Sequence, residues 1–336
     1  MPGELPVDYS IIIYNHSADE RILNRCLAAV LALDREGIVT EVLFIDNNHL
    51  TPAESLGFVR QAFSKIPNMR GVIIPQEGVK YAATEAIEQA SGKYIVFIDA
   101  DNEPEIDYLQ ELKRLNAQVE QVGAWGPGNV TVQFIDNIEK QLEEFARIAF
   151  RERHEDTLKT AHLKEWQPFY PFGPGLCILS CILKEYVVLE KKGRLTSGRT
   201  NGKITHGGED IQIVMLCIKK GYHAGVSPGL KLNHLIPKEK TSKEYLKKLV
   251  FSTAFSFEPA LLNMLPERKN ILKKKIISPL LFSAKAAKGL MAAKLGKQKN
   301  FFEAVHFMGS QAGIYQALEK PLPRFIKKMI AALRLK

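Results

Sequence analysis

Long apolar runs are absent from this sequence of 336 residues, and their absence excludes one class of protein. No stretch of about 18 consecutive apolar residues occurs, so the sequence predicts no transmembrane helix. Met1–Asp8 contains two acidic side chains and no basic segment followed by an apolar one. We therefore expect no signal peptide at this end.

Cysteine is also scarce. The four cysteines, Cys26, Cys177, Cys181 and Cys217, form no Cys-x-x-Cys pair and lie inside apolar segments. This pattern predicts reduced, buried thiols in a cytoplasmic protein. The alternative is a regulatory disulfide between Cys177 and Cys181.

Charge is unevenly distributed along the chain. Lys238–Lys336 holds 21 lysines and arginines against 6 acidic residues, whereas Met1–Pro237 holds 25 basic and 31 acidic residues. Such a division predicts two parts of the chain with different functions. We expect a catalytic domain over 1–240 and a helical, basic region over 241–336.

One stretch, Lys93–Pro104, contains the first candidate site. An apolar run, Tyr94–Ile98, is typical of a strand buried on both faces, and it ends in Asp99 and Asp101. Ligands of open α/β sheets bind outside the carboxyl ends of the strands. Carboxylate oxygens suit Mg²⁺ or Mn²⁺, which bind phosphates. The pattern predicts a metal that bridges the diphosphate of a sugar nucleotide; the alternative is a solvated turn in which Asp101 or Asn102 caps the next helix.

Strands and helices alternate over the first hundred residues, which predicts a parallel α/β sheet with right-handed crossovers. The expected strands are Val7–Tyr14, Glu41–Ile45, Gly71–Ile74 and Tyr94–Ile98, and the expected helices between them are Glu20–Leu33, Thr51–Ile66 and Tyr81–Ala90.

Asp46 follows the second of these strands, in the sequence Asp46-Asn47-Asn48. Because parallel strand ends meet at one edge, Asp46 would lie near Asp99 and Asp101 and accept a hydrogen bond from a nucleotide base. The alternative is an Asx turn, which these residues favour.

Three later features bear on an acceptor or a catalytic base. The aromatic and proline-rich Trp166–Gly175 forms either a packed loop or a wall of an acceptor-sugar pocket. Glu209 and Asp210 begin a helix after two glycines, so they either cap that helix or supply a general base. A lone histidine, His234, is either structural or a metal ligand.

The order of these elements resembles glycosyltransferase family 2, inverting enzymes with the GT-A fold. The blocks that carry this resemblance, over about Val7–Leu249, are Tyr14-Asn15, Phe44–Asn48, Gly78 before an alanine-rich helix, Ala90–Asp101, Gly207–Asp210, Gly221-Tyr222, Pro228 and His234. The family implies a Rossmann-like, mixed α/β sheet flanked by helices.

The resemblance also implies roles for individual residues. Tyr14 and Asp46 would contact the base, and Asp99 the ribose or sugar of the donor, near Gly78. Asp101 would hold Mn²⁺ or Mg²⁺ with Asp99 and His234. Asp210 would be the catalytic base and Glu209 would hold the acceptor. Family members commonly carry Ala-Arg-Asn where this chain has Ala82-Ala83-Thr84, and nearby Lys80 would replace that arginine.

The reaction implied is transfer of a sugar, from a UDP-sugar donor, to a hydroxyl of a glycan or lipid-linked acceptor with inversion, as in surface polysaccharide biosynthesis. In the basic region, apolar and lysine residues alternate at helical spacing in Lys273–Lys299 and Pro323–Lys336. Such helices are typical of membrane surfaces or calmodulin-like targets. We expect attachment to the inner face of the cell membrane; the alternative is a helix that packs on the catalytic domain.

Two rival functions remain. A nucleotidyltransferase acting on sugar phosphates usually needs a glycine-rich, basic phosphate loop near the first strand, and Tyr14–Arg21 is not one. A non-enzymatic nucleic-acid-binding protein would use the basic region. That region contains no recognised nucleic-acid module, and the acidic sheet edge would repel phosphates, so we expect no nucleic-acid partner.

Overall fold

The computed structural model describes residues 6–15, 19–46, 53–72, 79–195, 207–294 and 298–335. Contacts within the chain divide it into two compact units. The first contains 1–135, 152–188 and 216–237, and the second contains 136–151, 189–215 and 238–336. The division expected at residue 240 remains a prediction.

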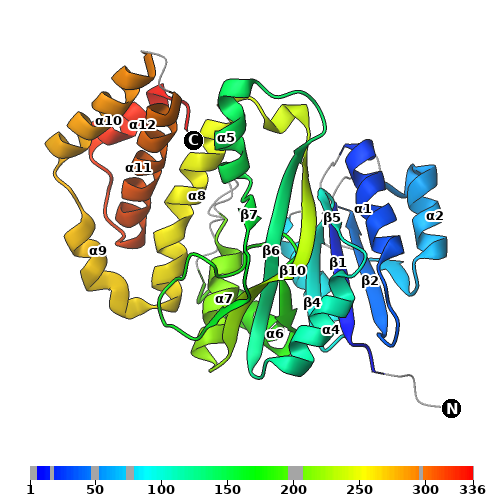
Figure 1. The fold of residues 1–336 in the computed structure, drawn as a ribbon. Coiled ribbons are helices and arrows are strands. Elements are labelled where there is room, and N and C mark those ends of the chain that lie inside the picture. Colours follow the sequence, from blue (N-terminus) through cyan, green and yellow to red (C-terminus); the bar gives the residue numbers. More distant parts are fainter. Residues whose placement is uncertain are drawn as a thin grey trace. The chain divides into compact units, whose positions relative to one another are not determined.

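The first unit contains a mixed sheet in the order β3-β2-β1-β4-β9-β6-β10-β5 (Figure 1). Its strands are β1 Tyr9–Asn15, β2 Thr40–Asp46, β3 Met69–Gly71, β4 Tyr94–Asp99, β5 Asn102–Pro104, β6 Val122–Phe134, β7 Arg153–His154, β8 Lys159–Ala161, β9 Cys177–Leu179 and β10 His223–Ile236. The first four pair in parallel, as predicted, whereas β9 is antiparallel to both β4 and β6. The expected mixed α/β sheet flanked by helices is confirmed.

The helices of this unit are α1 Glu20–Ala32, α2 Gly57–Lys65, α3 Val79–Gln89 and α4 Tyr108–Gln118, and α6 Ser180–Lys191 and α7 Glu209–Lys219 contribute residues to both units. Apolar side chains of α1, α2 and α4 pack with one face of β1, β2 and β4 in a single buried cluster. Alternate residues of the strands, such as Ile12 and Leu43, are equally buried. Both faces of the central strands are therefore covered, which explains their continuous apolar sequences.

Two predicted elements differ from the structure. The expected strand Gly71–Ile74 is β3, Met69–Gly71, and residues 73 and 74 lie outside the described residues. The expected helix Thr51–Ile66 is a short 3₁₀ turn, Ala53–Ser55, followed by α2, and Thr51 and Pro52 lie outside the described residues. The glycine-rich segment Gly123–Gly128 is part of strand β6. A Cβ on Gly126 would lie 2.5 Å from the side chain of Pro171, so this glycine allows the segment containing Pro171 to pack closely against β6.

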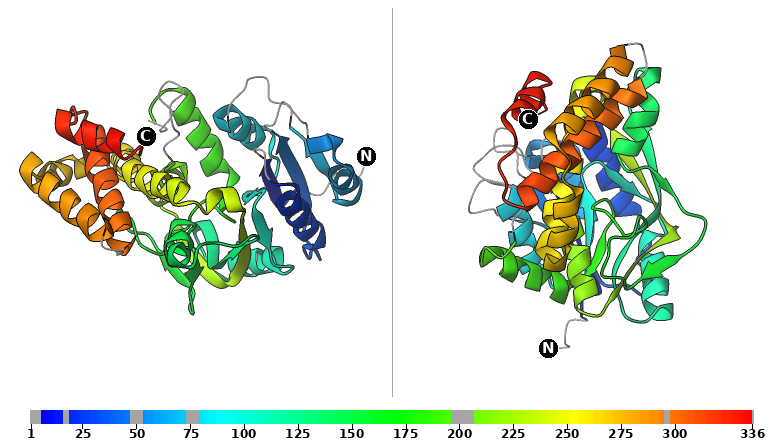
Figure 2. Two further views of the ribbon diagram at one scale, coloured as in Figure 1. Left: turned by 90° about the horizontal axis from the view of Figure 1, so that it is seen from above. Right: turned by 90° about the vertical axis from the view of Figure 1, so that its left-hand side faces the viewer.

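The second unit is helical among its described residues. It contains α5 Lys140–Ala149, α8 Lys243–Met264, α9 Lys269–Lys275, α10 Pro279–Lys294, α11 Gln298–Ala317 and α12 Arg324–Ala332, with 3₁₀ turns at Lys238–Lys240 and Pro266–Arg268. Helices α8 and α11 lie side by side (Figure 2). A Cβ on Gly309 of α11 would lie 2.5 Å from the carbonyl oxygen of Phe251, so glycine permits this close crossing.

All four cysteines are free thiols, so the structure contains no disulfide between Cys177 and Cys181. Cys26, Cys177 and Cys217 are buried as predicted, but Cys181 is exposed because it lies on the outer side of α6. No helix in the described part of the chain is both long and apolar enough to cross a membrane.

Candidate functional site

The carboxyl ends of three parallel strands meet at one edge of the sheet. Asn15 of β1 pairs in register with Asp46 of β2, and Tyr14 pairs with Asp99 of β4. Neighbouring strands lie about 4.8 Å apart, so the side chains that follow each strand end are close together. Three of the predicted donor-binding residues, Tyr14, Asp46 and Asp99, are thus brought to one edge.

Asp46 is held in place by its own loop. Its carboxylate accepts hydrogen bonds from Asn15 Nδ2 at 2.9 Å and from the backbone N–H of Ala53 at 2.5 Å. An Asx turn at Asp46 would involve residue 48, which lies outside the described residues, so that alternative remains untested. A contact of Asp46 with a nucleotide base remains a prediction.

Asp101 lies beside His234. Their nearest atoms, Asp101 Oδ2 and His234 Nε2, are 3.6 Å apart, and the two side chains are only 17% and 13% exposed. The pairing arises from β5, which follows Asp101 directly and runs antiparallel to β10, with Asn102 opposite His234. The backbone N–H of Leu235 also donates to the carbonyl of Asp101 at 2.8 Å.

Helix capping by Asp101 or Asn102 is not what the structure shows. The N-cap of α4 is Asp107, and Asn102 is completely buried in β5. Its side chain instead organises the Asp-x-Asp turn, because Nδ2 donates to Asp101 Oδ1 at 3.1 Å and Oδ1 accepts from the backbone N–H of Asp99 at 3.3 Å. Asn102 therefore holds the carboxylate of Asp101 and the backbone at Asp99.

Negative charge is concentrated around this turn. The buried thiol of Cys26 has a raised pKa, first because burial disfavours the thiolate and then because Asp101, Asp99 and Glu103 are negative. Glu103 itself pairs with Arg25, whose Nη2 lies 2.6 Å from its carboxylate. Hydrogen bonding from Arg25 is the main cause of the lowered pKa of Glu103. Of these acids, Glu103 is thus neutralised by its own partner.

The donor set fits a divalent cation that also binds phosphate. Among the residues that the structure describes, no cluster of three or more His, Cys, Asp or Glu side chains has metal-binding geometry. Mg²⁺ is usually bound through one or two carboxylates plus substrate phosphates and water, rather than by a complete protein cage. Asp101, paired with the imidazole of His234, provides such a partial set.

Two predicted donor-binding residues are not placed by the structure. Gly78 lies outside the described residues, and Lys80 lies in α3 with its side chain among those not described. Their roles remain predictions.

Glu209 and Asp210 are the first residues of α7 and belong to the second unit. Asp210 Oδ1 accepts a hydrogen bond from the backbone N–H of Ile211 at 2.8 Å, in keeping with the capping alternative. Arg151, in the same unit, interacts electrostatically with Asp210: burial lowers the pKa of the guanidinium and the charge of Asp210 opposes that shift. Gly208 adopts φ +121°, and a Cβ there would lie 2.9 Å from that of Ala260, so glycine is needed at the start of this helix.

The aromatic segment is at least partly a packed loop. Tyr170 is completely buried, and its hydroxyl bonds to the backbone of Leu163. Trp166 contacts the Tyr170 ring edge-on, with ring centroids 5.6 Å apart. A role for Trp166–Gly175 as the wall of an acceptor pocket remains a prediction.

The sequence did not reveal three residues that shape these sites. Asn102 and Arg25 act through a three-residue strand and a long-range ion pair, for which no local pattern exists. Arg151 follows an amphipathic helix and has φ +65°, a conformation unusual for arginine that its sequence context does not signal.

Comparison with known proteins finds similar glycosyltransferases. Residues 10–170 match the family model described as glycosyl transferase family 2. An N-acetylglucosaminyltransferase from Rhizobium leguminosarum bv. phaseoli is 29% identical over 117 residues. That alignment covers 34% of this chain and 27% of the relative, so the chain spans about a quarter of the relative's length.

Solved structures that align with this chain include TarS from S. aureus. TarS 1-349 is 12% identical, with a TM-score of 0.45 over 93% of this chain and 90% of that chain. TarS 1-349 in complex with UDP-GlcNAc is 12% identical, with a TM-score of 0.48 over 94% and 93% of the two chains.

Proposed function

We propose that this chain, whose residues 10–170 match the model of glycosyl transferase family 2, transfers a sugar from a nucleotide-diphosphate donor to a hydroxyl group. The observation that carries the proposal is the pairing of Asp101 with His234 beside the aligned ends of β1, β2 and β4. An acidic edge of this kind needs a cation before it can accept a diphosphate.

The donor lies at this edge. Tyr14 and Asp46 contact the base, and Asp99 the ribose or sugar. Asp101 and His234 hold Mn²⁺ or Mg²⁺, with Asp99 nearby, and the ion supplies charge neutralisation for the departing diphosphate. A UDP-sugar is the donor proposed, and the name of the Rhizobium relative makes UDP-GlcNAc the first compound to try.

Asp210 is the base that accepts the proton of the acceptor hydroxyl, and Glu209 holds the acceptor. Removal of that proton makes the oxygen a better nucleophile for one in-line displacement, which inverts the anomeric centre. Arg151, in the same unit, interacts electrostatically with Asp210. Both glutamate and aspartate are proposed from the Gly207–Asp210 motif.

The acceptor is a glycan or lipid-linked molecule at the inner face of the cell membrane, as in surface polysaccharide synthesis. Support comes from α10, where Leu280, Leu281 and Met291 are 83%, 45% and 61% exposed. Lys285 and Lys288 are exposed on the same helix. An anionic leaflet would attract these lysines and accept the apolar side chains.

A thermal-shift experiment with a panel of sugar nucleotides tests the proposal. In the presence of Mn²⁺, a bound donor at 100 times its Kd should stabilise the wild-type protein by about 2.7 kcal/mol, and chelation should abolish the shift. Asp101→Asn and His234→Asn should weaken Mn²⁺-dependent donor binding about tenfold or more. Asp156→Asn, at an exposed position, is the matched control.

Transfer to an acceptor is measured on the same proteins. Asp210→Asn should still show the donor-dependent shift but lose transfer by about 10²-fold or more, since general-base assistance contributes 10²–10⁴-fold. If donor binding were unaffected by chelation and by the substitutions at Asp101 and His234, the proposed metal site would be refuted. If Asp210→Asn turned over as fast as the wild type, Asp210 would not be the catalytic base.

A further inference from the structure

The helical unit contains a cavity of about 670 Å³ between α5, α8 and α11. This volume lies within the range of about 300–1,000 Å³ that is typical of small-molecule sites. All of its lining residues belong to the second unit, so the cavity is a feature of that unit alone. It is distinct from the acidic sheet edge, which is built from strands of the first unit.

The wall of the cavity is mainly apolar. The principal apolar side chains come from all three helices: Phe145 of α5, Leu249, Ala254 and Phe257 of α8, and Phe302 of α11. The Phe145 and Phe302 rings stack, with centroids 5.0 Å apart. Water in such a cavity gains few hydrogen bonds, so an apolar chain of matching size would displace it favourably.

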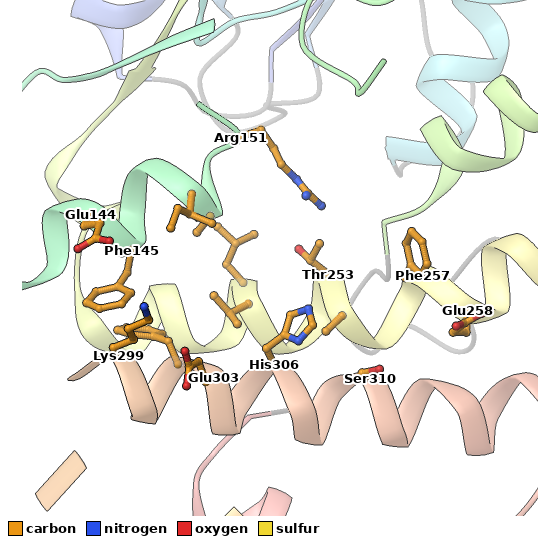
Figure 3. A pocket seen from close by; sticks show the side chains of 16 residues that line it. Glu144, Phe145, Arg151, Thr253, Phe257, Glu258, Lys299, Glu303, His306 and Ser310 are labelled. Carbon is orange, nitrogen blue, oxygen red and sulfur yellow. The ribbon is translucent and has the colours of Figure 1, made fainter. Parts of the chain in front are cut away.

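Arg151 is a cationic side chain among these lining residues. Arg151 follows α5, and its side chain extends toward Thr253 of α8 and His306 of α11 (Figure 3). Burial lowers the pKa of Arg151, so its charge is partly removed from water, and Asp210 opposes the shift. Guanidinium has five N–H donors in a planar fork, enough to serve a carboxylate and a second anion together.

The other charged side chains lining the cavity have different positions. Glu258 is buried but forms ion pairs with Arg268 and Lys275, each at 3.1 Å. Glu144, Lys299 and Glu303 are exposed. Burial, and then the charge of Arg151, lower the pKa of His306, which favours its neutral form. Arg151 is therefore the half-buried cation among the lining residues.

We infer that this cavity binds an amphiphile, with its apolar chain along α8 and α11 and an anionic head group at Arg151. The inference rests on the proposed transferase function, for which it supplies the acceptor site. Arg151 interacts electrostatically with Asp210, so an anionic group at Arg151 would lie in the same unit as the proposed base. The acceptor class is thus a lipid carrying a phosphate or a similar anion.

Isothermal titration calorimetry with decyl phosphate below its micelle concentration tests this site. Decyl phosphate should bind saturably to the full-length protein, decanol should bind more weakly, and inorganic phosphate alone should give no saturable heat. Arg151→Gln should weaken decyl phosphate binding about tenfold while affecting decanol little, because a hydrogen bond to a charged group is lost. Arg147→Gln is the matched control, since Arg147 forms a surface pair with Glu143 and does not line the cavity.

A second variant tests the cavity independently of the charge of Arg151. Thr253→Phe adds a ring inside the cavity and should weaken both decyl phosphate and decanol. Equal affinity of the wild-type, Arg151→Gln and Thr253→Phe proteins for decyl phosphate would overturn the inference, as would the absence of saturable binding or equal binding of phosphate alone. Asp101→Asn should retain decyl phosphate binding, so failure of the donor site and failure of this cavity are distinguishable.

Discussion

Glu41 is a buried carboxylate that joins two segments distant in sequence. One of its oxygens accepts hydrogen bonds from Ser10 Oγ at 2.6 Å and from both the backbone N–H and the Oγ of Ser91 at 2.7 Å. The other oxygen lies 3.4 Å from Arg70 Nη2. Burial opposes ionisation, but the hydrogen bonds from Ser10 and Ser91 outweigh it, and the pKa of Glu41 falls below its ordinary value of 4.5.

Replacement of Glu41 should therefore destabilise the protein. Glu41→Gln should lower the free energy of unfolding by about 2 kcal/mol, because donors now bonded to a charged group lose part of that interaction. The wild-type contribution should be complete above pH 4.5 and disappear as the pH falls through the lowered pKa, since the unfolded chain then binds the proton more readily.

Urea unfolding from pH 7 to pH 3 measures this effect. Glu120→Gln, at an exposed position, is the control and should change stability by less than about 0.5 kcal/mol. If Glu41→Gln and the wild type differed equally at pH 7 and pH 3, an ionised Glu41 would not be the source of the stabilisation.

Strands β6 and β10 depend on glycine where they lie closest together. A Cβ on Gly128 of β6 would lie 2.5 Å from the carbonyl oxygen of Ser227 in β10. Both atoms are fixed to backbone, so neither can turn away as the end of a flexible side chain could. The ladder is irregular at this point, with a register shift between Ser227 and Lys231. The glycine thus permits the close approach of the two strands at this irregular part of the ladder, which precedes His234 in β10.

Gly128→Ala should destabilise the protein by about 2 kcal/mol, through overpacking against backbone. Gly57→Ala is the matched control, because Gly57 begins α2 and a Cβ there meets nothing within 4 Å. Alanine favours the helix, so that variant should be neutral or slightly more stable. Thermal unfolding of both proteins gives the comparison; equal melting temperatures would contradict the close approach.

The long central elements were predictable because their patterns are local. β1, β2 and β4 are apolar runs buried on both faces, and α1 shows buried residues at helical spacing. The short strands β5 and β9 were missed, since three residues carry no periodic pattern and their pairing partners are far away in sequence. The pairing of such short strands depends on tertiary packing, which also explains why glycines occur inside β6.

The candidate site was predictable to a similar extent. Asp-x-Asp at a strand end has a local signature, and its partner His234 entered through the family resemblance. Asn102, which bonds the Asp101 carboxylate and the Asp99 backbone, and Arg151, which interacts with Asp210, have no such signature. Their roles depend on burial and on contacts made only in the folded chain.

For the whole molecule, the division of charge has a consequence for location. Residues 238–336 hold a net charge of +15, and the exposed side of α10 combines lysines with apolar side chains. The apolar residues Ile326 and Ile330 of α12, in contrast, are buried and so are not available to a membrane surface. Membrane binding is therefore best tested at α10.

Sedimentation with vesicles of phosphatidylcholine and phosphatidylserine measures this binding. Lys285→Gln and Lys288→Gln should each lower partitioning about fivefold, since a lysine near an anionic surface contributes about 1 kcal/mol. Raised salt should weaken wild-type binding in the same direction. Lys164→Gln and Lys184→Gln, at exposed positions of the first unit, should leave it unchanged. Equal pelleting of both pairs would contradict a membrane role for α10.

The antiparallel pairing of β5 with β10 also fixes when the proposed donor site can exist. Asp101 emerges early during synthesis, but the strand that brings His234 beside it is made much later. Until that strand has joined the sheet, the nascent chain has no imidazole next to the aspartate. A growing polypeptide would therefore meet the sugar nucleotides of the cell without being able to hold one in this way, and only the completed sheet would become a receptor for them.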